Sequence, residues 1–163
     1  MKINSLMIVL AFFSAVSLAA EPDHKQPISV DADKTLASLI DSIASYADNV
    51  VVRQGSMLIK ADKLEVDASA GKGKEVFITT GSPATYSQTL QGDRPVTAQA
   101  NEIRFDRASR ILTLSGNAEV MQSGSLVRGA VIRYNIELQQ LSAEGEQNRR
   151  VTTIFTPENK DTP

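Results

Sequence analysis

A seven-residue pattern that occurs three times constrains the fold of this chain most strongly. Its copies span residues 61–67, 100–106 and 129–135, and each contains an apolar–charged–apolar triplet followed by Asp or Asn. Side chains alternate between the two faces of a β-strand, so each copy predicts a strand with one apolar and one charged face. The residues before the first copy also match those before the third in register, Asn49 with Asn117 and Val52 with Val120. Such repetition indicates a stack of similar strand units.

Turn-forming residues separate the apolar segments along the whole chain. Short Gly-, Ser- or Asp-containing stretches occur at 54–56, 68–73, 91–95, 107–109 and 123–125. This spacing is typical of an all-β sandwich or barrel, and short turns imply that consecutive strands pair antiparallel. We expect an edge strand at 27–31 and a last strand at 151–155. We also expect a turn at Ser115-Gly116-Asn117 and a break between strands at Gly81-Ser82-Pro83.

One segment, residues 34–47, has two interpretations. Its apolar residues fall at helical spacing, and Asp33 is a suitable N-cap, which together favour an amphipathic helix. The alternative is a hairpin with strands at 35–40 and 43–47 and a turn at Asp41-Ser42. The local pattern leaves both open.

The first residues have the pattern of a cleaved signal peptide. Lys2 precedes a mostly apolar run over residues 3–16, and small residues at Ser17 and Ala19 favour cleavage after Ala19 or Ala20. The run is shorter than the roughly 20 apolar residues that span a bilayer. We therefore expect an exported protein with a signal peptide at 1–19. A flexible leader at 20–26 and a disordered tail at 158–163 are also expected.

Composition and motifs argue against several functional classes. The 17 basic and 19 acidic residues are nearly balanced, which does not suit nucleic-acid binding. Carboxylates are numerous enough to supply a glycosidase pair, but most occupy the polar positions of alternating strands. The chain has no GxSxG, HExxH or P-loop motif, and one histidine, His24. We expect no enzyme, no cofactor and no metal site.

A set of short phrases, in order from about residue 26 to 157, carries a family resemblance. Each phrase is a turn with part of a strand, and none is decisive alone. They are Gln26-Pro27-Ile28, Asn49-Val50-Val51-Val52-Arg53-Gln54-Gly55, Ala61-Asp62-Lys63, Gly73-Lys74-Glu75-Val76, Gly81-Ser82-Pro83-Ala84-Thr85-Tyr86, Gly116-Asn117-Ala118 and Arg149-Arg150-Val151-Thr152-Thr153. Together they resemble the OstA-like periplasmic bridge proteins of the lipopolysaccharide transport (Lpt) system.

This resemblance implies a fold, a function and partners. The fold is a semi-open antiparallel β-jellyroll over residues 27–157, a stacked, V-shaped pair of sheets, with a hairpin at 34–47. The function is to carry lipopolysaccharide from the inner to the outer membrane, with the acyl chains of lipid A in the dry interior. The partners are further copies joined head-to-tail, an inner-membrane Lpt component with a sister jellyroll domain, and the N-terminal periplasmic domain of the outer-membrane translocon.

The alternating strands then give candidate site residues. We expect a lipid-lining set consisting of Ile28, Val30, Leu64, Val66, Tyr86, Ile103, Phe105, Leu112, Leu114, Ile132 and Tyr134, with Tyr86 and Phe105 matching aromatic positions of the family. We expect an edge-strand assembly set consisting of Ile28, Ser29, Val30, Val151, Thr153 and Phe155. The alternative for these lining residues is ordinary closed core, and we expect about half of them to belong to it. The alternative function is a self-assembling structural or adhesive β-solenoid module without lipid cargo.

Overall fold

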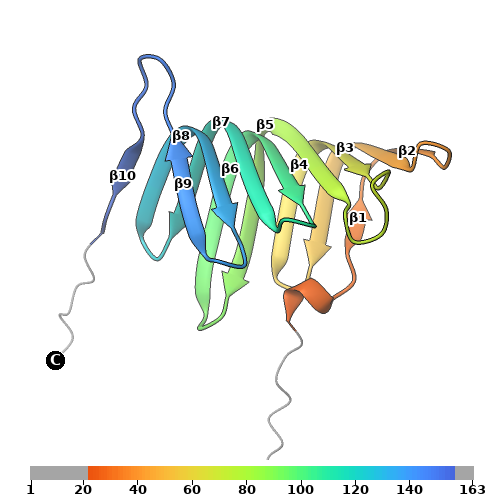
Figure 1. Ribbon diagram of the computed structural model, residues 1–163, viewed down its shortest axis with the longest axis horizontal. Helices are drawn as coiled ribbons and strands as arrows, with labels where there is room; N and C mark the ends of the chain where they lie inside the picture. Colours follow the sequence, from red (N-terminus) through yellow and green to blue (C-terminus); the bar gives the residue numbers. More distant parts are fainter. Residues whose placement is uncertain (1–21, 157–163) are drawn as a thin grey trace, which may run out of the picture.

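The computed structural model describes residues 22–156, which form one ten-stranded antiparallel sheet and a single 3-10 turn (Figure 1). The sheet order is β1-β3-β4-β5-β6-β7-β8-β10, with β2 also paired to β3 and β9 also paired to β8. The all-β prediction is confirmed. The elements are η1 Asp23–Lys25, β1 Ser29–Asp31, β2 Lys34–Ser38, β3 Ile43–Gln54, β4 Met57–Asp67, β5 Val76–Leu90, β6 Arg94–Asp106, β7 Ile111–Gln122, β8 Ser125–Asn135, β9 Gln140–Glu144 and β10 Thr152–Ile154.

A row of bends crosses the middle of the sheet. The strand register shifts at residues 48–49, 61–62, 81–83, 100–101 and 116–117, one bend in each of β3 to β7. Asn49 and Asn117 have left-handed backbones, with φ of 51° and 50°, a conformation that Asn tolerates better than most residues. These two are the matched asparagines of the repeat, which therefore marks equivalent bends. We call this row the fold line.

The fold line divides the sheet into two leaves that face each other. Leaf A consists of β2, β9 and residues 43–47, 63–67, 76–80, 102–106, 111–115 and 131–135. Leaf B consists of β1, β10 and residues 50–54, 57–61, 84–90, 94–100, 118–122 and 125–129. One end of the folded sheet carries β1 and β2, and the other carries β9 and β10 (Figure 1). This is the V-shaped architecture that the resemblance implied.

The closed core lies between the leaves next to the fold line. The first apolar residue of each repeat triplet, Leu64, Ile103 or Ile132, is at most 1% exposed. Opposite them, Ala84 and Ala100 of leaf B are fully buried. Small side chains at this level let the two leaves approach closely where the sheet bends, as close packing requires.

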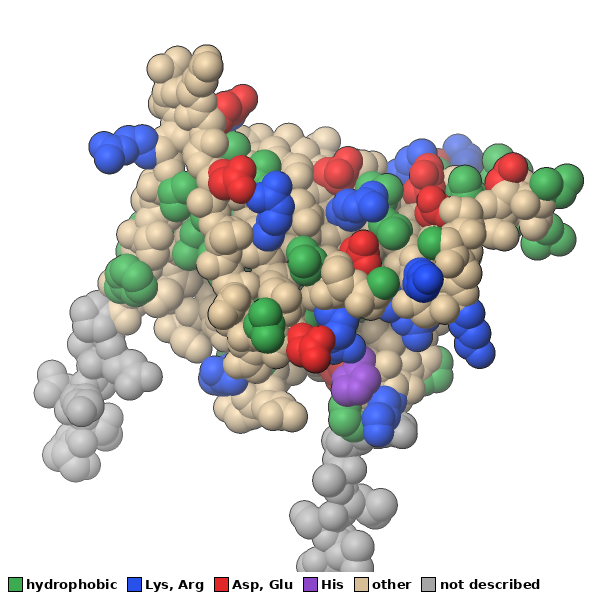
Figure 2. Space-filling view, in the orientation of Figure 1, with side chains coloured by type: hydrophobic (Ala, Val, Ile, Leu, Met, Phe, Trp, Pro, Cys, Tyr) green, Lys and Arg blue, Asp and Glu red, His purple; other side chains and the backbone are tan. Residues whose placement is uncertain are grey.

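The hairpin prediction for 34–47 is confirmed, and the helix alternative is wrong. β2 pairs with β3 from Lys34↔Ala47 to Ser38↔Ile43. Three of the aliphatic residues that suggested a buried helix face are exposed instead, in β2 and in the turn that follows it, and Figure 2 shows apolar side chains at the surface of this end of the sheet. Pairing with β3 therefore overrides the local helical spacing. These exposed residues are Leu36, Leu39 and Ile40.

The turn predicted at residues 115–117 and the strand break predicted at residues 81–83 are wrong. Gly116 and Asn117 do not reverse the chain, because β7 runs without interruption from Ile111 to Gln122. Residues 81–83 likewise lie inside β5. Both are bulges that bend a continuous strand, which a Gly-Asn pair permits as readily as a hairpin turn.

The sheet ends are shorter than expected. β1 covers 29–31 rather than 27–31, and β10 covers 152–154 rather than 151–155. The predicted signal peptide and the tail at 158–163 lie outside the described residues. Within residues 22–156, no helix is long and apolar enough to cross a membrane.

Candidate ligand-binding groove

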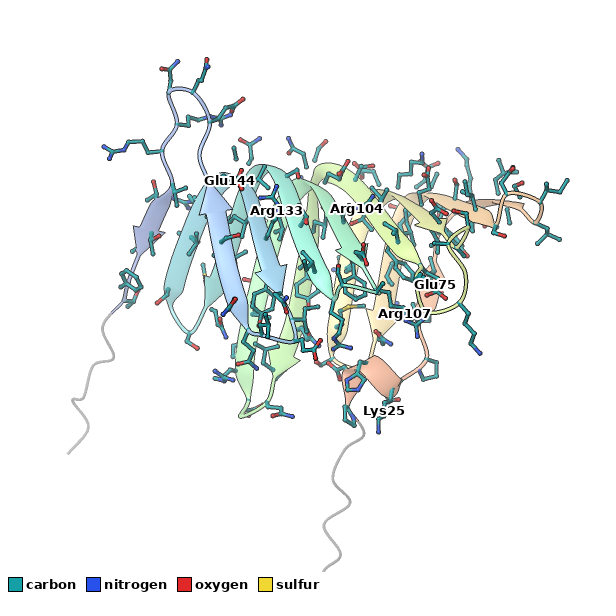
Figure 3. The ribbon with its side chains drawn as sticks, in the orientation of Figure 1. Lys25, Glu75, Arg104, Arg107, Arg133 and Glu144 are labelled. Carbon is teal, nitrogen blue, oxygen red and sulfur yellow. The ribbon has the colours of Figure 1, made fainter. Side chains whose placement is uncertain are left out.

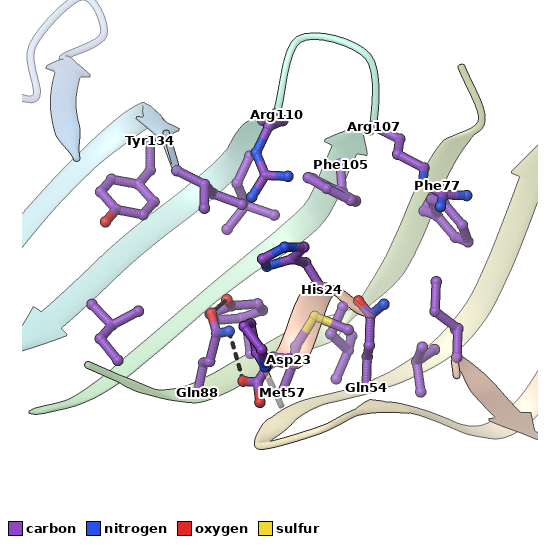
Figure 4. Close-up of a pocket in the computed structure, with 18 of the residues that line it drawn as sticks. Asp23, His24, Gln54, Met57, Phe77, Gln88, Phe105, Arg107, Arg110 and Tyr134 are labelled. Atoms are coloured by element: carbon purple, nitrogen blue, oxygen red, sulfur yellow. Dashed lines mark hydrogen bonds between the residues drawn. The ribbon is translucent and has the colours of Figure 1, made fainter. Parts of the chain in front are cut away.

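A cavity of about 740 Å³ lies between the leaves, on the side away from the fold line (Figure 4). Its volume falls within the ~300–1,000 Å³ of typical small-molecule sites. Exposed residues, among them His24, Arg107 and Gln139, contribute to its lining, so it is a groove that reaches the surface.

The leaf A wall is an apolar strip made by four neighbouring strands. Phe77 pairs with Phe105, Phe105 with Leu112, and Leu112 with Tyr134. The Phe77 and Phe105 rings are stacked, with centroids 6.2 Å apart, which is a favourable aromatic spacing. Three of these side chains are only half-buried and Leu112 is buried. The strip is therefore core-like in composition but only partly covered.

The leaf B wall changes from apolar to polar toward the mouth. Val52, Ile59 and Tyr86 are cross-strand neighbours and are buried. The Tyr86 hydroxyl donates a hydrogen bond to the Gln88 side-chain oxygen. Burial, reinforced by nearby Tyr134, raises the pKa of Tyr86 far above its ordinary value of 10.0. Tyr86 is thus a neutral hydrogen-bonding group inside the groove.

The N-terminal turn η1 is attached at the mouth. The Asp23 carboxylate accepts hydrogen bonds from the Ser56 backbone N–H at 3.0 Å and the Gln88 side-chain amide at 2.9 Å. Burial acts to raise the pKa of Asp23, but the hydrogen bonds from Ser56 and Gln88 outweigh it and lower that pKa below 3.8. Gly55 makes the contact possible, since a Cβ there would lie 2.1 Å from an Asp23 carboxylate oxygen. Part of the expected flexible leader is therefore held against the body.

Two arginines from the β6–β7 turn lie at the opposite side of the mouth. The Arg107 guanidinium contacts the Glu75 carboxylate at 3.1 Å, and backbone N–H groups of Glu75 and Gly73, together with Arg107, lower the pKa of Glu75. Among residues 22–156, Arg110 has no carboxylate within ion-pair distance. In Figure 4 it extends beside Phe105 toward the cavity. Apolar walls with an arginine, Arg110, on one side of the mouth suit a ligand that is apolar at one end and anionic at the other.

The charged residues of the repeat triplets lie outside the groove. Figure 3 shows Arg104 and Arg133 on the outer side of leaf A, where Arg133 pairs with Glu144. Both arginines are exposed. Their position agrees with the expected solvent-facing role.

The predicted lining residues divide by depth. Ile103, Leu114 and Ile132 belong to the closed core, and Val30 and Val66 pack against that core without lining the cavity. In the second and third triplets the second apolar residue lies farther from the fold line than the first, and Phe105 and Tyr134 reach the groove. The first triplet differs, because Leu64 lines the cavity and Val66 does not. The predicted residues that line it are Ile28, Leu64, Tyr86, Phe105, Leu112 and Tyr134.

Several groove residues were missed by the sequence analysis. Phe77 lies in an unbroken apolar run, Val76-Phe77-Ile78, in which alternation does not reveal the inward face. Gln88 and Arg110 carry no motif. Only the cross-strand register places Phe77 beside Phe105.

The predicted assembly residues lie at the two ends of leaf B. Ser29 and Val30 pair with β3 on one side only, and Thr153 pairs only with β8. Ile28 precedes β1, and Val151 and Phe155 flank β10. These strands are the edges of the sheet.

Comparison with known proteins identifies the family. Residues 29–140 match the family model described as LptA/(LptD N-terminal domain) LPS transport protein. The chain belongs to this family. The match covers β1 to β8, which form most of both leaves and most of the groove lining, while η1, β10 and nearly all of β9 lie outside it.

Similar family members come from three bacteria. The lipopolysaccharide export system protein LptA of Haemophilus influenzae is 39% identical, over 92% of this chain and 87% of that protein. LptA of Escherichia coli K12 is 32% identical, over 96% and 88%. The crystal structure of LptH, the LptA-homologous periplasmic component of the Pseudomonas aeruginosa transport device, superposes with a TM-score of 0.76 at 25% identity, over 83% of this chain and 99% of that one. The predicted family and fold class are confirmed.

Proposed function

We propose that this protein is a non-enzymatic lipopolysaccharide carrier that holds lipid A acyl chains in the groove between its leaves. It conveys lipopolysaccharide through the periplasm from the inner to the outer membrane. The observation that carries the proposal is the half-covered apolar strip of Phe77, Phe105, Leu112 and Tyr134 in a member of a transport family.

The energetics of the cargo support a sheltered route. Exposing one methylene to water costs about 0.8 kcal/mol, so a chain of about 12 methylenes carries a penalty of about 10 kcal/mol. A lipid with several such chains does not cross an aqueous compartment unaided. An apolar strip that runs across β5 to β8 replaces water along part of each chain.

The residues at the mouth of the groove suggest where the headgroup of lipid A would lie. Lipid A is amphipathic and anionic, and guanidinium groups bind phosphate through paired N–H donors. With acyl chains against Phe105 and Tyr134, the headgroup lies near Arg110, which has no acidic partner among the described residues. The groove runs between the end of the sheet that carries β1 and β2 and the end that carries β9 and β10, so lipid could pass to a neighbouring copy at either end.

Transfer requires contact between carriers at these ends. Exposed edge strands pair readily with another chain. We assign β1, with Ile28, Ser29 and Val30, and the β10 region, with Val151, Thr153 and Phe155, to head-to-tail addition. The same edges would meet an inner-membrane Lpt component with a sister jellyroll domain and the periplasmic N-terminal domain of the outer-membrane translocon.

Depletion in the producing bacterium tests the transport role. Newly made lipopolysaccharide should accumulate at the inner membrane, because no other carrier would shelter its acyl chains. Re-expression of the unaltered chain and of Arg104→Glu, on the outer side of leaf A, should restore export. Phe105→Glu, which places a charge in the strip, should restore it poorly at equal protein level. Normal export after depletion would contradict the proposal.

A further inference from the structure

The two ends of the folded sheet carry isolated opposite charges at the fold line. At one end, Asp33 lies in the β1–β2 connection and accepts a hydrogen bond from the Asn49 side chain at 2.6 Å. At the other end, Arg150 lies in the β9–β10 connection. Both side chains are exposed, and within residues 22–156 neither has an oppositely charged partner within 4.0 Å.

The strand directions allow the two ends to join. β1 is antiparallel to β3 and β10 is antiparallel to β8. Because five antiparallel pairings separate β3 from β8, β1 of one copy and β10 of another run in opposite directions when the sheet is continued. The same holds for β2 and β9. A second copy can therefore extend both leaves with antiparallel pairs, the pairing used throughout this sheet.

Continuing the cross-strand rows without a shift defines one register for a second copy. One outward-facing row of leaf B runs across the whole sheet, from Asp31 at β1 to Thr152 at β10. Continuing this row places Asp31 of the second copy beside Thr152. Two residues closer to the fold line on both strands, Asp33 of the second copy lies beside Arg150. The row consists of Asp31, Val51, Lys60, Thr85, Gln99, Glu119, Arg128 and Thr152.

A cross-strand row of leaf A also brings together two opposite charges from successive copies. Its row next to the fold line begins at Lys34 in β2 and ends at Glu144 in β9. Their side chains are 75% and 62% exposed. Continuing the row places Lys34 of the second copy beside Glu144. The row consists of Lys34, Ala47, Lys63, Thr80, Glu102, Ser115, Val131 and Glu144.

We propose that two charge pairs, Arg150 with Asp33 and Glu144 with Lys34 of the next copy, flank the fold line and set the register between successive copies. This proposal rests on the end-to-end assembly proposed above, and it names the side chains that select the register between two copies. A slip of two residues keeps the apolar faces aligned, since side-chain facing has a period of two. Such a slip separates both charge pairs and breaks the continuity of the fold line and groove.

Neighbouring charges are compatible with these pairs. Arg149 is bound to Glu146 at 2.8 Å and to the Asn117 side chain at 3.1 Å, which leaves Arg150 for the second copy. At the other end, Asp48 binds Lys34 at 2.7 Å. Glu144 is in turn bound to Arg133 of its own protomer. The Glu144–Lys34 pair therefore joins an ion-pair network, which holds charged side chains better than an isolated surface pair does, whereas Arg150 and Asp33 are free to pair with each other.

Charge reversal and restoration test the proposal. Self-association of the purified mature chain is measured by sedimentation velocity at low and high salt. Arg150→Glu or Asp33→Arg alone should weaken association about fivefold, as expected for the loss and reversal of an exposed pair. The double variant carries both reversals and should recover most of that loss. Arg104→Glu, an exposed arginine at the centre of leaf A, is the matched control and should change little.

Each outcome distinguishes the register device from the assembly itself. If Val30→Pro abolishes association but the charge reversals do not, the charge pairs are overturned and strand addition stands. If Arg150→Glu loses lipopolysaccharide retention while association is unchanged, Arg150 binds the ligand instead and the proposal is overturned. If the unaltered chain stays monomeric at every concentration, end-to-end assembly fails together with the pairs. Failure of the double variant to recover also contradicts the pairing.

Discussion

At the residue scale, the two apolar positions of the Ile103-Arg104-Phe105 triplet have different roles. Ile103 is 1% exposed and belongs to the closed core, whereas Phe105, two residues later, is half-buried and lines the groove. Arg104 between them faces solvent. In this triplet alternation gives the face of a side chain, and distance from the fold line gives its depth.

This difference predicts separate effects on stability and binding. Ile103→Ala should lower the free energy of unfolding by about 2–5 kcal/mol, because it leaves a cavity among close-packed side chains. Phe105→Ala should cost less stability, since that ring is already partly uncovered, yet should reduce lipopolysaccharide retention more than Ile103→Ala does. Urea unfolding and retention of labelled lipopolysaccharide on purified protein measure the two effects.

Arg104→Ala is the control, with an expected change within about 0.5 kcal/mol. Equal retention by Phe105→Ala and the unaltered chain would remove Phe105 from the groove's function.

The sequence alone could reveal faces but not depth. The triplets Leu64-Glu65-Val66 and Ile103-Arg104-Phe105 have the same pattern, and nothing in them states which apolar residue lies nearer the bend. Phe77 escaped notice because its neighbours are also apolar. Arg110 required the tertiary structure, since a lone arginine in a turn has no pattern to detect.

At the element scale, the bends rather than the strands determine the architecture. The repeat matches Asn49 with Asn117, and Gly116-Asn117 predicts a hairpin turn because Gly and Asn favour positive φ in hairpin turns and in bulges alike. In the structure they bend one long strand. Hairpin turns and bulges use the same residues, so only the pairing on both sides separates them.

The attachment of η1 should depend on pH. Asp23 has a lowered pKa in the folded state, so its ionised form is favoured by folding. Its stabilisation is present above the ordinary value of 3.8 and is lost as pH falls through the lowered value. We expect the Ser56 amide resonance to shift in that range as η1 detaches.

Asp23→Asn should abolish this titration while leaving the sheet intact. A Ser56 resonance that does not move as the pH falls from about 6 to about 2 would contradict the attachment. A shift shared by amides throughout the sheet would indicate global acid unfolding instead.

At the scale of the whole molecule, one folded sheet forms both the groove and the edge strands at its two ends. Folding along one line brings leaf A and leaf B together, closes the core near the bend and leaves the groove between the outer parts of the leaves. The ends of the sheet carry edge strands and complementary charges. The resemblance to OstA-like proteins implied this arrangement, whereas periodicity alone reached only an all-β stack.

The central claim is that acyl chains lie between the leaves. Photo-crosslinking groups placed singly at Phe105, Tyr134, Arg104 and Arg133 test it most directly, in cells that synthesise lipopolysaccharide. We expect lipopolysaccharide adducts from Phe105 and Tyr134, which line the groove, and none from the two arginines on the outer side of leaf A. Adducts from the arginine positions alone would contradict the account.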